Sequence, residues 1–192
     1  AAAPLSDRVE WAVYTVLSTT SLTSLEAAER IVHALFPGLQ TAEPGLVDMC
    51  VQSYATPASP IHWQLRPADA LAQRARDHTE MITLLAELGH RLGFKVWIGR
   101  AELRHRHHGA ALTGLLSVAE RYMNVEDILP DATEHSQLGD IIWYQNRRAS
   151  HVFEVEWTAM LGDSVLRRGS RAAGLQRFVV VPPERIELLK AK

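Results

Sequence analysis

Three carboxylates lie on segments that the sequence predicts to be neighbouring strands. Asp140 stands at the start of one apolar segment, and Glu154 and Glu156 lie two residues apart on the next. Side chains two residues apart on a strand project from the same face, so these glutamates would repel each other unless a divalent cation lay between them. With Asp140 they form an oxygen-ligand set suited to Mg²⁺ or Mn²⁺, and such a metal can activate water for phosphodiester hydrolysis. The alternative is that Glu-Val-Glu is only the solvent face of an exposed strand.

Further candidate residues surround this set. Glu80 lies beside the apolar stripe of a predicted helix, where it either reaches inward or is a solvated helix acid. The histidines His105, His107 and His108 lack the spacing of zinc ligands, which favours a solvated basic loop. Phosphate contacts require only positive charge and reach, and the alternative for each basic residue is plain solvent exposure. The candidate DNA-contacting arginines are Arg100, Arg104, Arg106, Arg147, Arg148, Arg167, Arg168 and Arg171.

Helical and strand patterns alternate after about residue 76. An apolar stripe predicts a helix over residues 78–91, and its members are Met81, Leu84, Leu85, Leu88 and Leu92. Apolar segments predict strands at residues 94–98, 140–144, 151–157 and 177–181, with a turn at 145–148. An arginine-rich helical connection precedes the last strand, and a final helix is expected over residues 184–190. Strands joined by a helical crossover predict an α/β (α+β) fold with a mixed central sheet flanked by helices.

The first 75 residues have a different pattern. Ser6 and Ser24 are suited to cap two helices, and residues 43–51 predict a third. Residues 61–66 alternate like a short strand, so this segment resembles a winged-helix module. The third helix of such a module usually contacts DNA, but here it carries Glu43 and Asp48 and no lysine or arginine. A module for protein contacts or structural support is therefore the favoured alternative. The expected domains are residues 1–75 and 76–192.

Composition and net charge limit the classes of protein to which the chain can belong. Of its 192 residues, 47% are hydrophobic and 22% are charged, as is typical of a globular protein. The net charge of −2 excludes a strongly basic nucleic-acid coat, and it divides into −3 up to residue 75 and +1 beyond. Cys50 is the only cysteine and no apolar run is long enough to cross a bilayer, so we expect a cytoplasmic protein without a membrane partner. The start at Ala1 rather than at methionine indicates processing or a piece of a longer protein.

The region from about residue 78 to residue 190 resembles the PD-(D/E)XK, restriction-endonuclease-like superfamily. Besides the helix at residues 78–91, the resemblance rests on residues 92–97 (LGFKVW), 139–143 (GDIIW), 153–156 (FEVE) and 177–181 (RFVVV). It implies that Asp140 is the metal-binding aspartate, that Glu154 occupies the (D/E) position, and that Glu80 is the first-helix acid that often joins the site. Glu156 occupies the place usually held by lysine, where a carboxylate would serve as a general base or a further metal ligand.

The resemblance implies a metal-dependent DNA endonuclease of a restriction or mobile-element defence system. Mg²⁺ or Mn²⁺ is the implied cofactor and DNA the implied partner, and a homodimer or a larger restriction or defence assembly is expected. Two alternatives remain. The replaced lysine and the weakly basic charge fit a catalytically inactive module of the same fold that binds DNA or an assembly partner. A regulatory winged-helix protein is the second alternative, and it requires residues 1–75 to bind DNA despite their acidity.

Overall fold

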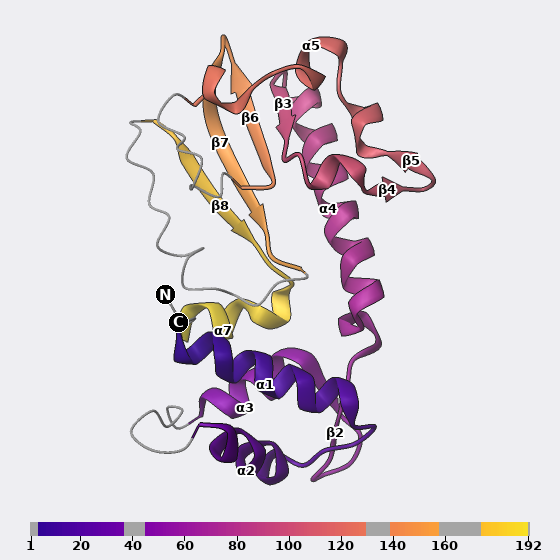
Figure 1. Ribbon diagram of the computed structural model, residues 1–192, viewed down its shortest axis with the longest axis vertical. Coiled ribbons are helices and arrows are strands. Elements are labelled where there is room, and N and C mark those ends of the chain that lie inside the picture. Colours follow the sequence, from indigo (N-terminus) through magenta and orange to yellow (C-terminus); the bar gives the residue numbers. More distant parts are fainter. Residues whose placement is uncertain (1–3, 37–44, 130–138, 158–173, 192) are drawn as a thin grey trace. The chain divides into compact units, whose positions relative to one another are not determined.

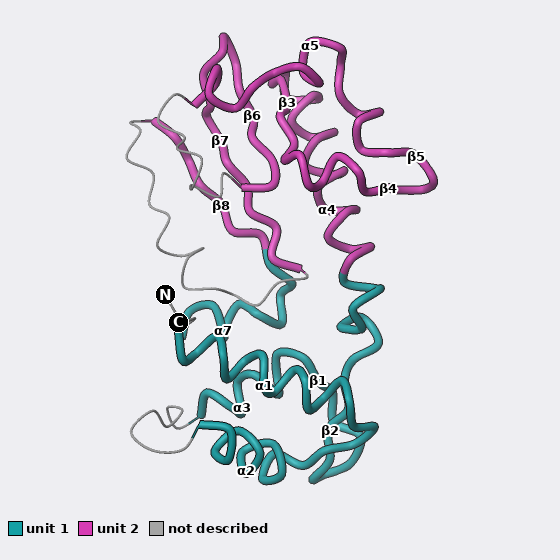
Figure 2. The backbone as a smooth tube through the Cα atoms, in the orientation of Figure 1, with its two compact units in different colours: residues 1–74, 158–164, 181–192 teal, residues 75–157, 165–180 magenta. Residues whose placement is uncertain are grey.

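The computed structural model describes residues 4–36, 45–129, 139–157 and 174–191 (Figure 1). These residues fall into two compact units with separate apolar cores (Figure 2). Unit 1 consists of the described residues in 1–74 and 181–192, and unit 2 of those in 75–157 and 165–180. The expected division assigned the end of the chain to the second domain. The structure assigns it to unit 1, because Leu188 is fully buried in the core of that unit.

Unit 1 is a group of helices with a two-stranded antiparallel sheet. Its core is formed by the apolar sides of these helices, and Val9, Val13, Cys50, Val51 and Leu188 are fully buried there. The elements are α1 (Leu5–Thr19), α2 (Leu25–Leu35), α3 (Leu46–Tyr54), β1 (Ala55–Pro57), β2 (Trp63–Leu65), η1 (Pro67–Asp69), η5 (Pro183–Arg185) and α7 (Ile186–Ala191).

The helix starts in unit 1 agree only in part with the sequence. Ser24 caps α2 as predicted, because its hydroxyl oxygen accepts the backbone N–H of Ala27 at 3.1 Å. The prediction that Ser6 caps the first helix is wrong. Ser6 lies inside the first turn of α1, and Pro4 precedes the helix with a φ of −50° that the proline ring imposes. The expected helix start at residues 43–44 lies outside the described residues.

Charged side chains are buried around Tyr54 in unit 1. The Tyr54 hydroxyl donates to the carboxylate of Glu10, and the guanidinium of Arg185 lies 4.6 Å from the centre of the Tyr54 ring. Arg185 also pairs with Asp69 at 3.4 Å. Burial, followed by the charge of Glu10, raises the pKa of Tyr54. The network ties the end of the chain to α1 and α3.

Unit 2 is built on a four-stranded mixed sheet in the order β3-β6-β7-β8 (Figure 1). β3 (Lys95–Ile98) and β6 (Ile141–Gln145) are antiparallel, and β6 forms an antiparallel hairpin with β7 (Arg148–Val155). β8 (Gln176–Val180) runs parallel to β7. The hairpin turns at Asn146 and Arg147, whose positive φ values of 50° and 57° are those of a two-residue type I′ turn. The predicted α+β fold with a mixed central sheet is thereby confirmed.

The helix α4 (Leu71–Arg91) packs on one face of this sheet. It starts earlier than residue 78, where the sequence predicted its beginning. Ile82 and Ala86 are its fully buried apolar residues, whereas Leu84 and Leu88 of the predicted apolar stripe are 50% and 46% exposed. The prediction of the buried side is therefore wrong for these leucines, because the indole of Trp143 packs directly on the helix and donates to the carbonyl of Leu85 at 3.0 Å.

Short elements connect β3 to β6. The carboxylate of Glu120 fixes this connection, because it accepts the backbone N–H of Val96 at 2.8 Å and that of Ser117 at 2.7 Å, and lies 3.0 Å from His90 Nε2. The segment around His105, where a solvated basic loop was expected, contains a 3-10 turn and a hairpin strand, and residues 112–121 form two short helices. The elements are η2 (Glu102–Arg104), β4 (Arg106–His107), β5 (Ala110–Ala111), η3 (Leu112–Leu115), α5 (Val118–Arg121) and η4 (Val125–Asp127). The expected crossover helix before β8 lies outside the described residues.

Candidate metal centre

Within the described residues, one set of three side chains brings metal-ligating atoms together. It consists of His78 on α4, Glu102 on η2 and Asp140 directly before β6, and their ligand atoms lie within 4.8 Å of one another. All three residues belong to unit 2. Because each comes from a different element, the packing of unit 2 creates the cluster, and no local sequence motif could.

The backbone on either side fixes the position of Asp140. Its N–H donates to the carbonyl of Phe153 at 2.9 Å, and its own carbonyl accepts the N–H of Gly99 at 2.9 Å. The carboxylate oxygen Oδ2 of Asp140 accepts the N–H of Val155 at 2.7 Å. The ends of β3 and β7 therefore both hold this residue in place.

The glycine before Asp140 makes this close approach possible. Gly139 has a φ of +83°, which side chains other than hydrogen rarely allow. A Cβ atom at this position would lie 2.7 Å from Val152 Cγ1 and 2.8 Å from the carbonyl oxygen of Phe153. Gly139 thus allows the close backbone approach, and Asp140 supplies the carboxylate of the site.

Glu102 lies between two imidazoles. Its oxygen Oε2 is 3.1 Å from His78 Nε2 and 3.0 Å from His105 Nδ1. His78 is buried, whereas Glu102 is partly accessible and His105 is about half exposed. A charged, partly buried carboxylate with imidazoles on both sides can bind a proton or a metal ion through the same atoms.

The pKa values of the pair follow from these contacts. Burial acts to lower the pKa of His78, but the hydrogen bond with Glu102 and the negative charges of Asp140 and Glu102 outweigh it, so the net shift is upward. The hydrogen bond with His78 lowers the pKa of Glu102, against the opposing effect of burial. Without a metal, the pair therefore favours a protonated His78 beside an ionised Glu102.

The donor set fits a divalent cation. Two carboxylates supply the oxygen ligands preferred by Mg²⁺ and Mn²⁺, and a neutral imidazole adds a nitrogen ligand that suits Mn²⁺ and later transition metals better than Mg²⁺. Asp140 and Glu102 are only partly buried, so solvent reaches the cluster from their side. A metal site needs such access if it is to bind water or substrate at its remaining positions.

The acids singled out from the sequence occupy different places. Glu154 is half-buried on β7, between the two residues whose backbones bond to Asp140. Glu156 is buried just after β7, and its N–H donates to the carbonyl of Val180 at 2.9 Å. Within the described residues, Asp140, Glu154 and Glu156 do not gather their three carboxylates within 4.8 Å of one another. Metal binding by both glutamates stays a prediction.

Glu80 lies away from the cluster. It is exposed on α4, two residues after His78. Residues two apart on a helix point about 200° away from each other, so the side that presents His78 to the cluster turns Glu80 to solvent. His78 occupies the place on the first helix that the sequence-based interpretation gave to Glu80.

The predicted DNA-contacting arginines separate into groups. Arg100, Arg104 and Arg106 are exposed in the segment that contains Glu102, next to the cluster. Arg147 and Arg148 are exposed at the β6–β7 turn, at the opposite end of β6 from Asp140 and therefore about 15 Å along the strand from it. Arg167, Arg168 and Arg171 lie outside the described residues.

Sequence reasoning missed His78 and Glu102. The signal for Glu102 is its position as an isolated acid between Arg100 and Arg104, in a segment otherwise rich in positive charge. The signal for His78 is its spacing of four residues before Ile82 and eight before Ala86, which places it on the buried side of the helix. Neither signal identifies a site residue until the buried side of α4 is known, because that side places His78 beside Glu102.

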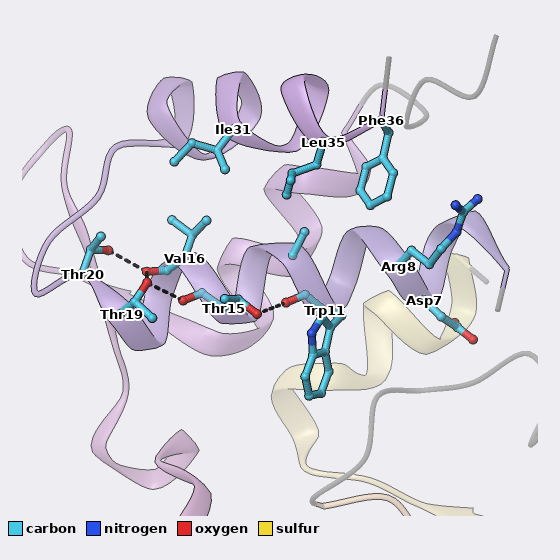
Figure 3. Close-up of a pocket in the computed structure, with 11 residues that line it drawn as sticks. Asp7, Arg8, Trp11, Thr15, Val16, Thr19, Thr20, Ile31, Leu35 and Phe36 are labelled. Carbon is cyan, nitrogen blue, oxygen red and sulfur yellow. Dashed lines mark hydrogen bonds between the residues drawn. The ribbon is translucent and has the colours of Figure 1, made fainter. Parts of the chain in front are cut away.

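A second hollow lies within unit 1, in the groove between α1 and α2 (Figure 3). Its volume is about 860 Å³, and the side chain of Val16 on α1 points toward Ile31 and Leu35 on α2. Asp7 and Arg8 lie at one end, and they are the charged residues of its lining. The groove is mainly apolar and offers no set of metal ligands. Within the described part of the chain, the candidate metal ligands lie in unit 2.

Comparison with known families places this geometry in context. Residues 60–186, more than half of the chain, match the family described as Type II restriction enzyme NmeDI C-terminal domain. The chain belongs to this family. Neither a curated protein nor a solved structure matches it. The match to the NmeDI C-terminal domain family includes all three residues of the cluster and all four strands of the unit 2 sheet.

In the part of the chain that the structure describes, no helix combines the length and the apolar composition needed to cross a bilayer.

Proposed function

We propose that the chain is a metal-dependent DNA endonuclease of restriction type, with its catalytic centre at His78, Glu102 and Asp140. The observation that carries the proposal is the convergence of an imidazole and two carboxylates beside a basic segment, in a chain of a restriction-enzyme family. The mixed sheet and the hairpin, with Asp140 directly before one strand and Glu154 on the next, support a PD-(D/E)XK-type domain in unit 2. Unit 1, with three helices followed by a small antiparallel sheet, is proposed to be a winged-helix-like module.

The residues of the site have distinct roles in this proposal. Asp140 and Glu102 would hold the cation through carboxylate oxygens, and His78 through its imidazole nitrogen. A divalent cation bound there supplies Lewis-acid activation of water and neutralises charge on the phosphodiester. Glu154, held beside Asp140 by the strand pairing, completes the acidic surface, and Glu156 is the candidate general base in the place usually held by lysine.

DNA binding follows from the charge next to the cluster. Arg100, Arg104 and Arg106 lie on both sides of Glu102 in sequence, so a phosphate backbone that contacts them passes close to the site. Within the described part of the chain, none of these three arginines is in an ion pair; Arg106 donates to the carbonyl of Gly109. Their charge is available to neutralise DNA.

The test combines metal binding and DNA cleavage. Mn²⁺ and Mg²⁺ are titrated calorimetrically into the whole chain, and supercoiled plasmid is incubated with protein and each metal. Asp140→Asn keeps an oxygen that can accept the Val155 N–H but removes the negative charge. We expect this variant and the separate Glu102→Gln variant each to reduce Mn²⁺ affinity and DNA cleavage about 100-fold or more. Glu126→Gln is the matched control, because Glu126 is an exposed acid of the same unit.

Three outcomes separate the alternatives. Loss of cleavage in Asp140→Asn and Glu102→Gln, with Glu126→Gln unchanged, supports the proposal. Cleavage that persists undiminished in both variants, or in excess chelator, contradicts it. Metal binding that depends on Asp140 without any cleavage by the wild type would favour the inactive DNA-binding module, for which the replacement of lysine by Glu156 is the motivating observation. A parallel Glu154→Gln variant shows whether that acid belongs to the same site.

A further inference from the structure

A small pocket lies in unit 2 beside β3, the outer strand of the described sheet. It is formed between β3 and the segment of α5, and its volume is about 190 Å³. Sites for drug-sized ligands have volumes of about 300–1,000 Å³, so this pocket suits a single flat ring system. We call it the edge pocket, and the residues of its lining that matter here are Trp97, Ile98, Arg100, Leu103, Tyr122 and Asn124.

Hydrogen bonds hold the walls of the edge pocket in place. The buried carboxylate of Glu120, which also lines the pocket, accepts the N–H groups of Val96 and Ser117. These two bonds join the start of α5 to β3. On the same side, Nε of Arg121 donates to the carbonyl of Leu116 at 3.0 Å. The pocket is therefore preformed, and binding a ligand does not require its walls to become ordered.

The side chains of the edge pocket offer the contacts that a nucleotide needs. Tyr122 is 81% exposed and Trp97 is partly buried, so aromatic surface is available on which a base can stack. The exposed amide of Asn124 both donates and accepts hydrogen bonds, as the edge of a base does. Arg100 is exposed and supplies a positive charge for a phosphate. A ring, an amide and a cation together fit a nucleobase that is attached to its phosphate.

The edge pocket and the metal cluster share one corner of unit 2. Arg100 and Leu103 line the pocket, and Glu102 of the cluster lies between them in the sequence. Gly99 adjoins both sites, because its N–H donates to the carbonyl of Asp140 at 2.9 Å and a Cβ atom there would lie 3.8 Å from Cγ of Glu102. A nucleotide with its base in the pocket would therefore have its phosphate within reach of the cluster.

We propose that the edge pocket binds a base that has turned out of the DNA stack, next to the phosphodiester at the metal cluster. The inference rests on the proposed function, because it names the state of the substrate at that same site. A paired base is enclosed in the duplex and cannot enter a pocket of this size. Turning it out breaks its stacking and pairing, which costs least where the base is already unpaired. The protein is thus expected to prefer DNA that contains an unpaired base.

The experiment measures the binding of labelled duplexes to the whole chain by fluorescence anisotropy, in chelator so that metal-dependent cleavage does not occur. Four duplexes each carry one bulged nucleotide, with A, C, G or T as its base, and a fifth carries a bulged abasic nucleotide in the same place. The abasic duplex has the same backbone bulge without a base, so the difference in affinity measures binding of the base alone. For at least one base we expect the wild type to bind about tenfold more tightly than to the abasic duplex.

Substitutions in the lining test whether the edge pocket causes this preference. Tyr122→Ala and Asn124→Ala are each expected to reduce it severalfold, and the double variant to abolish it. Tyr122→Phe retains the ring and should retain the preference. Val118→Ala is the matched control, because Val118 is 70% exposed on α5 and does not line the pocket. Equal affinity of the wild type for the abasic duplex and all four bulged bases, or a preference that survives in the double variant, would overturn the inference.

Two further measurements separate this inference from its alternatives. The four free deoxynucleoside monophosphates are titrated into the wild type, and binding as tight as that of the preferred bulged duplex would identify a site for free nucleotides instead of DNA. Asp140→Asn is expected to keep the base preference although it loses cleavage. Metal-dependent cleavage without any base preference would contradict this inference alone, whereas base preference without cleavage would contradict the proposed function alone.

Discussion

Glu102 is the residue on which the charge balance of the site depends. One of its oxygens contacts both His78 and His105, and the ligand atoms of Asp140 and His78 lie within 4.8 Å of each other. In the absence of metal, a proton on His78 neutralises part of this acidic cluster. The upward shift of the His78 pKa and the downward shift of the Glu102 pKa both result from the attraction between the protonated imidazole and the ionised carboxylate.

This attraction predicts how stability changes with pH. A histidine whose pKa is raised on folding stabilises the folded state below its unfolded pKa, and the contribution is lost as pH rises through the raised folded value. We therefore expect His78→Gln to lower the free energy of unfolding by about 1–3 kcal/mol near pH 5.5, where a charged hydrogen bond is lost, and much less near pH 8.5. Urea unfolding in chelator, followed by tryptophan fluorescence, measures this difference.

At low pH the dependence is reversed, and stability falls as the pH falls. Glu102 has a lowered pKa, so its contribution is present above its unfolded pKa and is lost as pH falls through the folded value. The pair is thus most stabilising between these two limits. His33→Gln, which makes the same replacement at an exposed position in unit 1, serves as the control for a histidine outside the cluster. Equal destabilisation by His78→Gln at both pH values would contradict the assigned ion pair.

At the scale of elements, α4 is placed by small residues rather than by its leucines. A Cβ atom at Gly89 would lie 2.7 Å from Nε1 of Trp143, the atom that donates to Leu85. The helix and the sheet thus approach each other at a glycine, and this contact turns Ile82 and Ala86 inward and Leu84 outward.

We predict that Gly89→Ala destabilises unit 2 by about 1–3 kcal/mol, because the added methyl group displaces the indole or moves the helix away from the sheet. Gly114→Ala is the control, since no atom lies within 4 Å of the corresponding Cβ position. Thermal unfolding of both variants checks the prediction. A Gly89→Ala variant as stable as Gly114→Ala would mean that α4 is positioned by other contacts.

The same contact explains how far the sequence could predict the structure. Strand positions followed from local apolar segments, and the β6–β7 turn from its polar residues, because these patterns depend on neighbours in sequence. The rotation of α4 depended on Gly89 meeting Trp143 across the fold, and a leucine stripe is the stronger signal for a buried face when sequence alone is considered. Because the rotation was predicted wrongly, Glu80 was selected in place of His78. Asp140 was singled out from the sequence because its strand could be located, and it lies with His78 and Glu102 in the structure; its role as a metal ligand stays a prediction.

At the scale of the whole molecule, unit 1 is assembled from both ends of the chain. α7 follows β8 of unit 2 in sequence, yet Leu188 is fully buried in the core formed by α1 and α3. Arg185, also fully buried, pairs with Asp69. The N-terminal helices therefore depend on a segment that follows unit 2 in the sequence.

This dependence is testable by hydrogen exchange. Leu188→Ala is expected to remove about 2–5 kcal/mol from the stability of unit 1, since it opens a cavity in a close-packed core. Exchange of α1 peptides should then become faster, while β6 peptides in unit 2 keep their protection. Ile186→Ala, at a position that is 41% exposed on the same helix, should change neither set. Equal acceleration in both units would contradict a role confined to unit 1.

The discontinuity of unit 1 has a consequence for protein engineering. A chimera made by cutting the chain once, near residue 75, would leave the donor helices without α7 and the recipient with an unpaired apolar tail. Unit 2 is better treated as a cassette inserted into unit 1, with one junction inside α4 and the other between β8 and η5. Exchange of the whole cassette at these two junctions keeps Leu188 and Arg185 with their own core, so grafting experiments should be designed as insertions and not as end-to-end fusions.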